Sequence, residues 1–266
     1  MDINQIELIC KEVCEIVKEV GLFIKNERGK VSSEQIEEKD LNSLVSYVDK
    51  SAEMQLVEKL GQLIPSSTFL TEEEVVEQKP GQYRWIIDPL DGTTNFLHQV
   101  PCFAISVALE IEGSISLGIV YEINQDECFY AWKNGGSFLN GRPIFVSNTT
   151  QLSKSLIATG FPYQDYSLVI PYFKVFNHFM KNTRGIRRIG AAAVDLAYVA
   201  CGRFDAFFEY GLNAWDVAAG AIIVKEAKGV VYDFDGKNNF LFGKEMIASN
   251  ANISVEVLDI IKEAFK

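Results

Sequence analysis

The sequence predicts a mixed fold of α-helices and β-strands, in which two successive parts of the chain order these elements differently. The first part opens with helical patterns and continues with several strand patterns in a row, which is typical of an antiparallel sheet with helices packed on it. The second part alternates strand and helix patterns, which is typical of an α/β layer. Hydrophobic residues make up 48% of the 266 residues, so the chain can bury a large core without disulfides or structural metals.

The first part begins with two predicted helices. Residues 3–26 place apolar side chains at steps of three and four, which predicts an amphipathic helix. We expect the polar segment 26–42 that follows to be a mobile surface loop. A second helix is predicted over 51–64, where Ser51 would cap the start and Pro65 would end the pattern.

The remaining elements are predicted from β-branched and aromatic runs and from helical spacing. In the first part, strands are expected over 83–88, 103–111, 115–121 and 127–132, with a hairpin over 135–141. In the second part, strands are expected over 155–159, 204–209, 230–233 and 246–249, and helices over 166–180, 191–201, 215–228 and from Ser254 onward. No linker composition marks a boundary, so we expect residues 1–150 and 151–266 to be two halves of one compact unit.

The composition argues against several classes of protein. The chain carries 25 Lys and Arg against 36 Asp and Glu, and the net charge of −11 argues against bulk nucleic-acid binding or a basic membrane-surface protein. The acidic N-terminus lacks the basic start of a signal peptide, and no apolar run approaches the roughly 20 residues of a membrane span. We therefore expect a reduced, cytoplasmic protein, in which five cysteines without any CxxC pair are core residues: Cys10, Cys14, Cys102, Cys128 and Cys201.

Several familiar catalytic motifs are absent from the sequence. It contains no GxGxxG, GxxxxGK[ST], HExxH or GxSxG string, so it lacks the usual signatures of dinucleotide binding, P-loop chemistry, zinc proteolysis and α/β-hydrolase chemistry. The only two histidines are His98 and His178. A packing or capping role is the better interpretation of each, so histidine catalysis and a histidine-bound metal have little support.

The most informative segment is WIIDPLDGTTNF, residues 85–96. An apolar strand ends at Asp88, and Asp91 follows three positions later, with the carbonyl of Leu90 between them. These oxygens suit Mg²⁺. Gly92 lets the backbone approach a ligand closely, and Thr93 and Thr94 add hydroxyls and exposed N–H groups where a helix could begin. A plain strand-to-helix turn is the alternative, but chance would place the full DPxDGT string in such a chain only about once in ten thousand.

Two further acidic groups have plain alternative interpretations. Glu72, Glu73 and Glu74 form a run that is usually a solvated surface, although one of them could reach the same site from an adjacent loop. Asp216 opens the string WDVAAG, where an aspartate is commonly only a helix N-cap. Spacing alone cannot bring Asp216 to Asp88.

Together these strings resemble the inositol monophosphatase family, a branch of the magnesium-dependent, lithium-sensitive phosphatases. The matching strings are TEE (71–73), DPLDGTTNF (88–96) and WDVAAG (215–220), with further similarity over 43–53, 160–162, 187–209 and 247–250. The resemblance thus extends over nearly the whole chain. It departs from the family pattern at Thr71, where glycine is usual, and at Ala191, where serine or threonine is usual.

The resemblance implies a role for each matching residue. The implied metal ligands are Glu72, Asp88, the Leu90 carbonyl, Asp91 and Asp216. The implied catalytic residues, which activate the attacking water, are Glu72, Thr93 and its acidic partner Asp49. The implied phosphate cradle is formed by the backbone amides of Gly92 and Thr93. The implied contacts to the alcohol are Asp91, the Ala192 backbone and Glu209.

The resemblance also implies a layered αβαβα sandwich, two to three Mg²⁺ ions per active site, inhibition by Li⁺, and a homodimer. The first half would supply metal-binding loops, and the second would supply Asp216 and the substrate side. The expected reaction is hydrolysis of a small phosphorylated alcohol or sugar, first of all myo-inositol monophosphate. The alternatives are fructose-1,6-bisphosphate, phosphoadenosine phosphate or histidinol phosphate as substrate, or a regulatory role on RNA-processing or transcription machinery. Divalent ions would offset the acidic charge that otherwise disfavours a phosphate.

Overall fold

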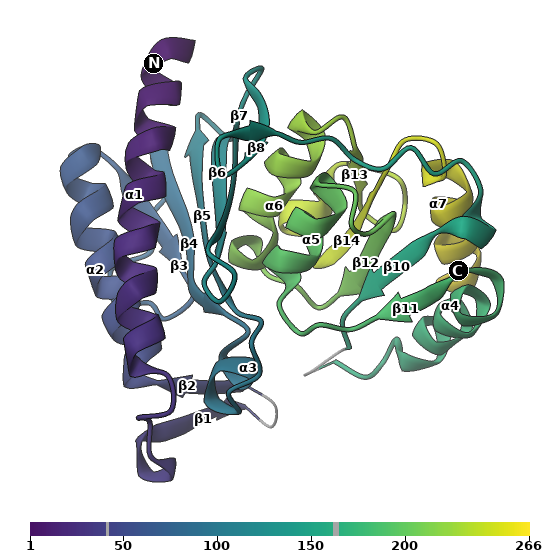
Figure 1. Ribbon diagram of the computed structural model, residues 1–266, viewed down its shortest axis with the longest axis horizontal. Helices are drawn as coiled ribbons and strands as arrows, with labels where there is room; N and C mark the ends of the chain where they lie inside the picture. Colours follow the sequence, from purple (N-terminus) through teal and green to yellow (C-terminus); the bar gives the residue numbers. More distant parts are fainter. Residues whose placement is uncertain (41–42, 162–164) are drawn as a thin grey trace.

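The computed structural model describes residues 1–40, 43–161 and 165–266, and it stacks them in five layers. Figure 1 shows an outer layer of helices, then a sheet, an inner layer of helices, a second sheet and another outer layer of helices. The helices of these layers are α1 (Ile3–Glu27), α2 (Tyr47–Leu63), α5 (Ala192–Ala200), α6 (Ala214–Glu226), α4 (Val169–Asn182) and α7 (Ser254–Ala264). The expected αβαβα sandwich is confirmed, whereas the expected division near residue 150 stays a prediction.

Helix α2 begins four residues earlier than predicted. Ser46, not Ser51, is its N-cap: the Ser46 hydroxyl accepts a hydrogen bond from the Val48 amide at 3.2 Å. The Asp49 carboxylate in turn accepts one from the Ser46 amide at 2.9 Å, which completes a capping box. The prediction failed because the first turn contains Tyr47 and Val48, which read equally well as the end of a strand.

The predicted polar loop is also wrong for most of its described length. Residues Ser33–Gln35 form a 3-10 turn, and β1 (Ile36–Asp40) pairs antiparallel with β2 (Ser43–Ser46) near the base of Figure 1. Strand pairing uses backbone groups, so polar side chains do not prevent it. Residues 41–42, at the end of the predicted loop, lie outside the described residues.

The first sheet has seven strands, in the order β3-β4-β5-β6-β7-β8-β9. Their bounds are Thr68–Thr71, Tyr83–Asp91, Ala104–Ile111, Ser114–Glu122, Glu127–Trp132, Gly136–Leu139 and Arg142–Pro143. Neighbouring strands are antiparallel, as expected, except for β3, which the sequence analysis missed and which lies parallel to β4. This parallel pair matters for the site, because both strands end at the same edge of the sheet.

The second sheet has five strands, in the order β11-β10-β12-β14-β13. Their bounds are Gly185–Arg187, Leu156–Thr159, Ala206–Tyr210, Glu245–Ser249 and Val230–Tyr232. Strands β11, β10 and β12 are parallel, and β14 and β13 continue the sheet antiparallel. Short elements complete the fold: α3 (Thr93–Leu97) and the 3-10 turns Leu152–Lys154 and Asn239–Leu241. Strand β11 was missed because it is only three residues long.

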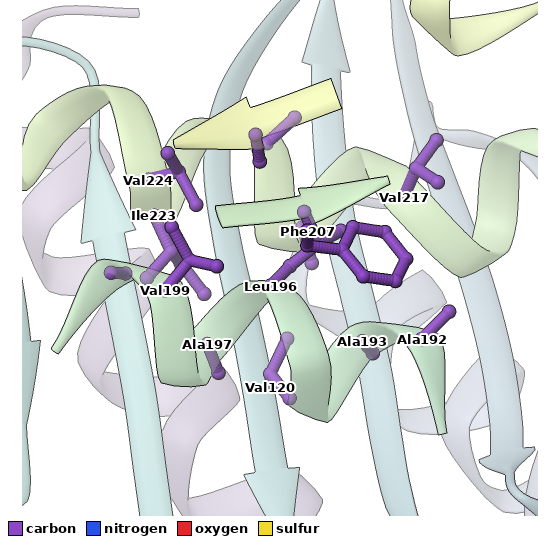
Figure 2. Close-up of a cluster of buried hydrophobic side chains, with 14 of the residues drawn as sticks. Val120, Ala192, Ala193, Leu196, Ala197, Val199, Phe207, Val217, Ile223 and Val224 are labelled. Atoms are coloured by element: carbon purple, nitrogen blue, oxygen red, sulfur yellow. The ribbon is translucent and has the colours of Figure 1, made fainter. Parts of the chain in front are cut away.

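Helices α5 and α6 pack between the two sheets because their side chains are small. Figure 2 shows the resulting cluster, with Val120, Ala192, Ala193, Leu196, Ala197, Val199, Phe207, Val217, Ile223 and Val224 labelled. A Cβ atom added to Gly118 of β6 would lie 2.7 Å from the Ala219 carbonyl oxygen, so α6 rests directly on that strand. The chain therefore brings the start of both helices close to the edge of the first sheet.

The cysteines and histidines follow their predicted roles in part. Cys10, Cys14 and Cys128 are buried, whereas Cys102 and Cys201 are half-buried. His98 is the C-cap residue of α3, and His178 lies exposed on α4. Within the described ranges, no helix combines the length and the apolar character that a membrane span requires.

Candidate metal centre

A cavity of about 470 Å³ opens where the two sheets and the inner helices meet. Strand β4 delivers Asp88 and Asp91 to its wall, and the loop after β3 delivers Glu72. Because Thr71 of β3 pairs with Ile87 of β4, Glu72 comes to lie beside Asp88. Helix α6 adds Asp216, which is 128 positions from Asp88 in the sequence (216 − 88). The fold thus gathers four acidic side chains from three parts of the chain.

Backbone amides hold each of the three aspartates in place. Asp88 Oδ1 accepts a hydrogen bond from the Leu90 amide at 2.9 Å, and Asp91 Oδ2 accepts one from the Ala193 amide at 2.7 Å. Asp216 Oδ2 accepts one from the Asn213 amide at 2.6 Å, within the capping box of α6. The predicted N-cap role of Asp216 is therefore wrong: Asn213 is the N-cap of α6, and Asp216 is the third helical residue, which pairs with it in the capping box and also lines the cavity.

Burial and neighbouring charges raise the pKa of all three aspartates. Burial, followed by the charge of Glu72, holds the pKa of Asp88 well above its usual range, and the two carboxyls are in hydrogen-bond contact. Burial raises the pKa of Asp91 to about 7, although hydrogen bonds from the start of α5 oppose that shift. Burial and the charge of Glu72 also hold the pKa of Asp216 well above its usual range. A bound divalent cation would relieve this repulsion directly.

The chemistry of these donors fits Mg²⁺, which prefers carboxylate and carbonyl oxygens. The Leu90 carbonyl lies at the same wall. In the described part of the chain, no three acidic, histidine or cysteine side chains are already gathered closely enough to hold a metal ion. These side chains would have to move closer together around an ion.

A tight turn follows the two aspartates. Gly92 has φ 90° and is the N-cap of α3, a conformation that favours glycine. A Cβ atom there would lie 3.1 Å from the Cys102 carbonyl oxygen and 3.2 Å from that of Gly190. Thr93 comes next, and its hydroxyl oxygen lies 2.9 Å from Asp49 Oδ1 and 2.9 Å from the Leu90 carbonyl oxygen. The expected Thr93–Asp49 pair is thus in contact.

The remaining predicted residues come from the second part of the chain. Ala192 begins α5, and Glu209 lies in β12, with burial as the main cause of its strongly raised pKa. Every predicted site residue lines the cavity except Asp49, which reaches it through Thr93. Of the three glutamates in the run, only Glu72 is among the lining residues of the described chain.

Sequence reasoning missed two acidic residues of this region. Glu53 is fully buried in α2 and accepts hydrogen bonds from the Thr71 hydroxyl, the Glu73 amide and the Val75 amide, at 2.7 to 2.9 Å. It therefore fixes the loop that carries Glu72. Asp195 lines the cavity from α5. The available signal was a single charge within the apolar string AAAVDLAYVA.

Similarity to known proteins extends over the whole chain. Residues 6–264 match the model of the inositol monophosphatase family. The Inositol-1-monophosphatase of Mesorhizobium japonicum is 39% identical, over 91% of this chain and 92% of that protein. The Nus factor SuhB of Pseudomonas aeruginosa is 41% identical, over 85% and 86%. Among solved structures, the extragenic suppressor protein suhB from Bartonella henselae superposes with a TM-score of 0.91 at 38% identity, over 96% of this chain and 99% of that one.

Proposed function

Because the chain belongs to the inositol monophosphatase family, we propose that it hydrolyses a phosphate monoester with Mg²⁺, myo-inositol monophosphate before other esters. The observation that carries the proposal is the cavity itself. It collects Glu72 and three aspartates with raised pKa values, beside a glycine turn where the backbone can approach a phosphate closely. Such a cluster is costly in a metal-free protein, and divalent ions would stabilise it.

The ions would be held by Glu72, Asp88, Asp91 and Asp216, with the Leu90 carbonyl as a further oxygen ligand. When bound, two to three Mg²⁺ ions would lower the pKa of a water and neutralise the leaving alcohol oxygen. The chain's own part is to fix these oxygens. The amides of Leu90, Ala193 and Asn213 do this for the aspartates.

Thr93 and Asp49 would orient the attacking water together with Glu72. The Thr93 hydroxyl would donate its hydrogen to Asp49 Oδ1, 2.9 Å away. A Thr93 lone pair can then accept a hydrogen bond from the water. Backbone amides of Gly92 and Thr93 would bind the phosphate oxygens. Asp91, the Ala192 backbone and Glu209 would bind hydroxyls of the alcohol. Li⁺ would inhibit the reaction by competing for a Mg²⁺ site.

A phosphate-release screen tests the proposal. The purified protein is offered inositol, sugar and nucleotide phosphates with Mg²⁺, with excess chelator, and with Mg²⁺ plus Li⁺. We expect release from inositol monophosphate that requires Mg²⁺ and falls with Li⁺. Faster phosphate release from fructose-1,6-bisphosphate, phosphoadenosine phosphate or histidinol phosphate would show that this ester, and not inositol monophosphate, is the substrate. Full activity in excess chelator would refute the metal-dependent mechanism.

A regulatory role on RNA-processing or transcription machinery is a second candidate. The names of several relatives, including the Nus factor SuhB of Pseudomonas aeruginosa, favour it. A pull-down from cytoplasmic extract with and without substrate separates the two, since a purely catalytic protein retains no such partner. We also propose that the protein is cytoplasmic and forms a homodimer, and light scattering of the purified chain can check the dimer.

A further inference from the structure

One buried carboxylate oxygen at the cavity is not satisfied by the described part of the fold. Asp195 of α5 is 1% exposed, and its Oδ1 atom has no hydrogen-bond partner among the described residues. Four buried side-chain atoms of the described residues share that condition: Trp85 Nε1, Ser137 Oγ, Asp195 Oδ1 and Ser249 Oγ. Within this set, Asp195 alone is acidic and alone lines the cavity.

The surroundings of Asp195 indicate that its side chain destabilises the folded state. Its neighbours along α5 are the buried apolar residues Ala193, Val194, Leu196 and Ala197. Burial holds its pKa well above the usual range, the charges of Glu209 and Asp91 add to this, and only Arg188 opposes it. A buried polar group without a partner destabilises the fold, so its presence calls for a reason outside the fold.

The position of Asp195 supplies such a reason. Asp195 lies one turn after Ala192, where α5 meets the cavity. Among nearby charges, that of Glu209 raises the pKa of Asp195 most. Arg188 lines the same cavity and favours the charged form of both carboxyls. Two acceptors from different elements, α5 and β12, therefore share one wall.

We propose that Asp195 is a specificity-determining residue, which accepts a hydrogen bond from a substrate hydroxyl beside Glu209 and so selects a polyhydroxylated alcohol phosphate. The inference rests on the proposed function. Two neighbouring acceptors require two donors, which a polyol offers on adjacent carbons. An ester without hydroxyls leaves both acceptors unpaired, and sites built around such hydrogen bonds discriminate strongly against analogues that lack them.

The test compares two probes, myo-inositol 1-phosphate and p-nitrophenyl phosphate, by the ratio of their kcat/KM values. Asp195→Ala is expected to lower this ratio about tenfold, the effect of one hydrogen bond. Asp195→Asn keeps a carbonyl acceptor, so its ratio is expected to lie between those of Asp195→Ala and the wild type. The Tm of Asp195→Ala should equal or exceed that of the wild type, because the substitution removes an unpaired buried group.

Asp205→Ala is the matched control. Asp205 is a buried aspartate outside the cavity, and its Oδ2 atom accepts a hydrogen bond from the Leu156 amide at 2.7 Å. Its substitution should lower the Tm without changing the ratio. If Asp195→Ala is active and the ratio of kcat/KM values is unchanged, or if its Tm falls as much as that of the control, the inference is wrong while the proposed function stands. If the wild type hydrolyses neither probe, the proposed function fails and the inference fails with it.

Discussion

Replacing Gly160 by alanine should displace Glu209 without disturbing the fold. Gly160 follows β10, and Glu209 lies beside it in the parallel neighbour β12. A Cβ atom on Gly160 would lie 2.0 Å from one Glu209 carboxylate oxygen and 2.1 Å from the other. Contacts of a Cβ atom below 3.0 Å essentially never occur, so a shift of at least 1.0 Å is required (3.0 − 2.0).

The carboxyl must move, because the backbone at Gly160 is held. The Tyr172 hydroxyl donates a hydrogen bond to the Gly160 carbonyl oxygen at 2.7 Å from within the core. A misplacement of about 1 Å at a binding group can cost up to a hundredfold in rate. We therefore expect Gly160→Ala to lower kcat/KM for myo-inositol 1-phosphate by about 10- to 100-fold, with little change in Tm.

A double-mutant cycle assigns this loss to Glu209. Steady-state phosphate release is measured for the wild type, Gly160→Ala, Glu209→Ala and the double variant. If the new methyl group acts by moving the carboxyl, it has no further effect once Glu209 is alanine, and the double variant matches Glu209→Ala. Losses that multiply in the double variant, or full activity of Gly160→Ala, would refute the reasoning.

Three further predictions follow from the site. Asp91→Asn should abolish Mg²⁺-dependent phosphate release while circular dichroism shows an intact fold, and near-normal turnover would be against its place among the metal ligands. Thr93→Val keeps the shape but removes the hydroxyl next to Asp49, so kcat should fall about 100-fold with a smaller change in KM; an equal loss through KM alone would contradict a role in water activation. Asp195 and Glu209 have raised pKa values in the folded state, so their contribution to stability is full below about pH 4 and is lost as the pH rises toward those values. Urea unfolding of the chelated protein from pH 4 to 8 should show a shallower fall in the free energy of unfolding for Asp195→Asn than for the wild type, and identical slopes would count against this.

Local sequence predicts some residues of the site but not others. Asp88, Leu90 and Asp91 are predictable from local chemistry, because a strand end, a proline and a glycine lie within a few positions of one another. Glu72 and Asp216 are not, since only the parallel pairing of β3 with β4 and the packing of α6 bring them to the same cavity. Only the resemblance to the family assigned Glu72 and Asp216 to the same site as Asp88.

The elements that prediction missed share a cause. Strands β1, β3 and β11 span only three to five residues, and their stability comes from pairing rather than from side-chain patterning. The cap of α2 at Ser46 depends on the reciprocal Asp49 side chain, which the sequence analysis assigned to Thr93 alone. The orphaned oxygen of Asp195 is visible only once burial and hydrogen bonds are known.

The central claim is that the four acidic side chains form a metal centre. Anomalous diffraction from crystals soaked in Mn²⁺, which accepts the same oxygen ligands as Mg²⁺, tests it most directly. We expect anomalous peaks at about 2.0–2.3 Å from carboxylate oxygens of Glu72, Asp88, Asp91 and Asp216. Crystals that bind Mn²⁺ elsewhere, or not at all, with these carboxyls left apart would contradict the account.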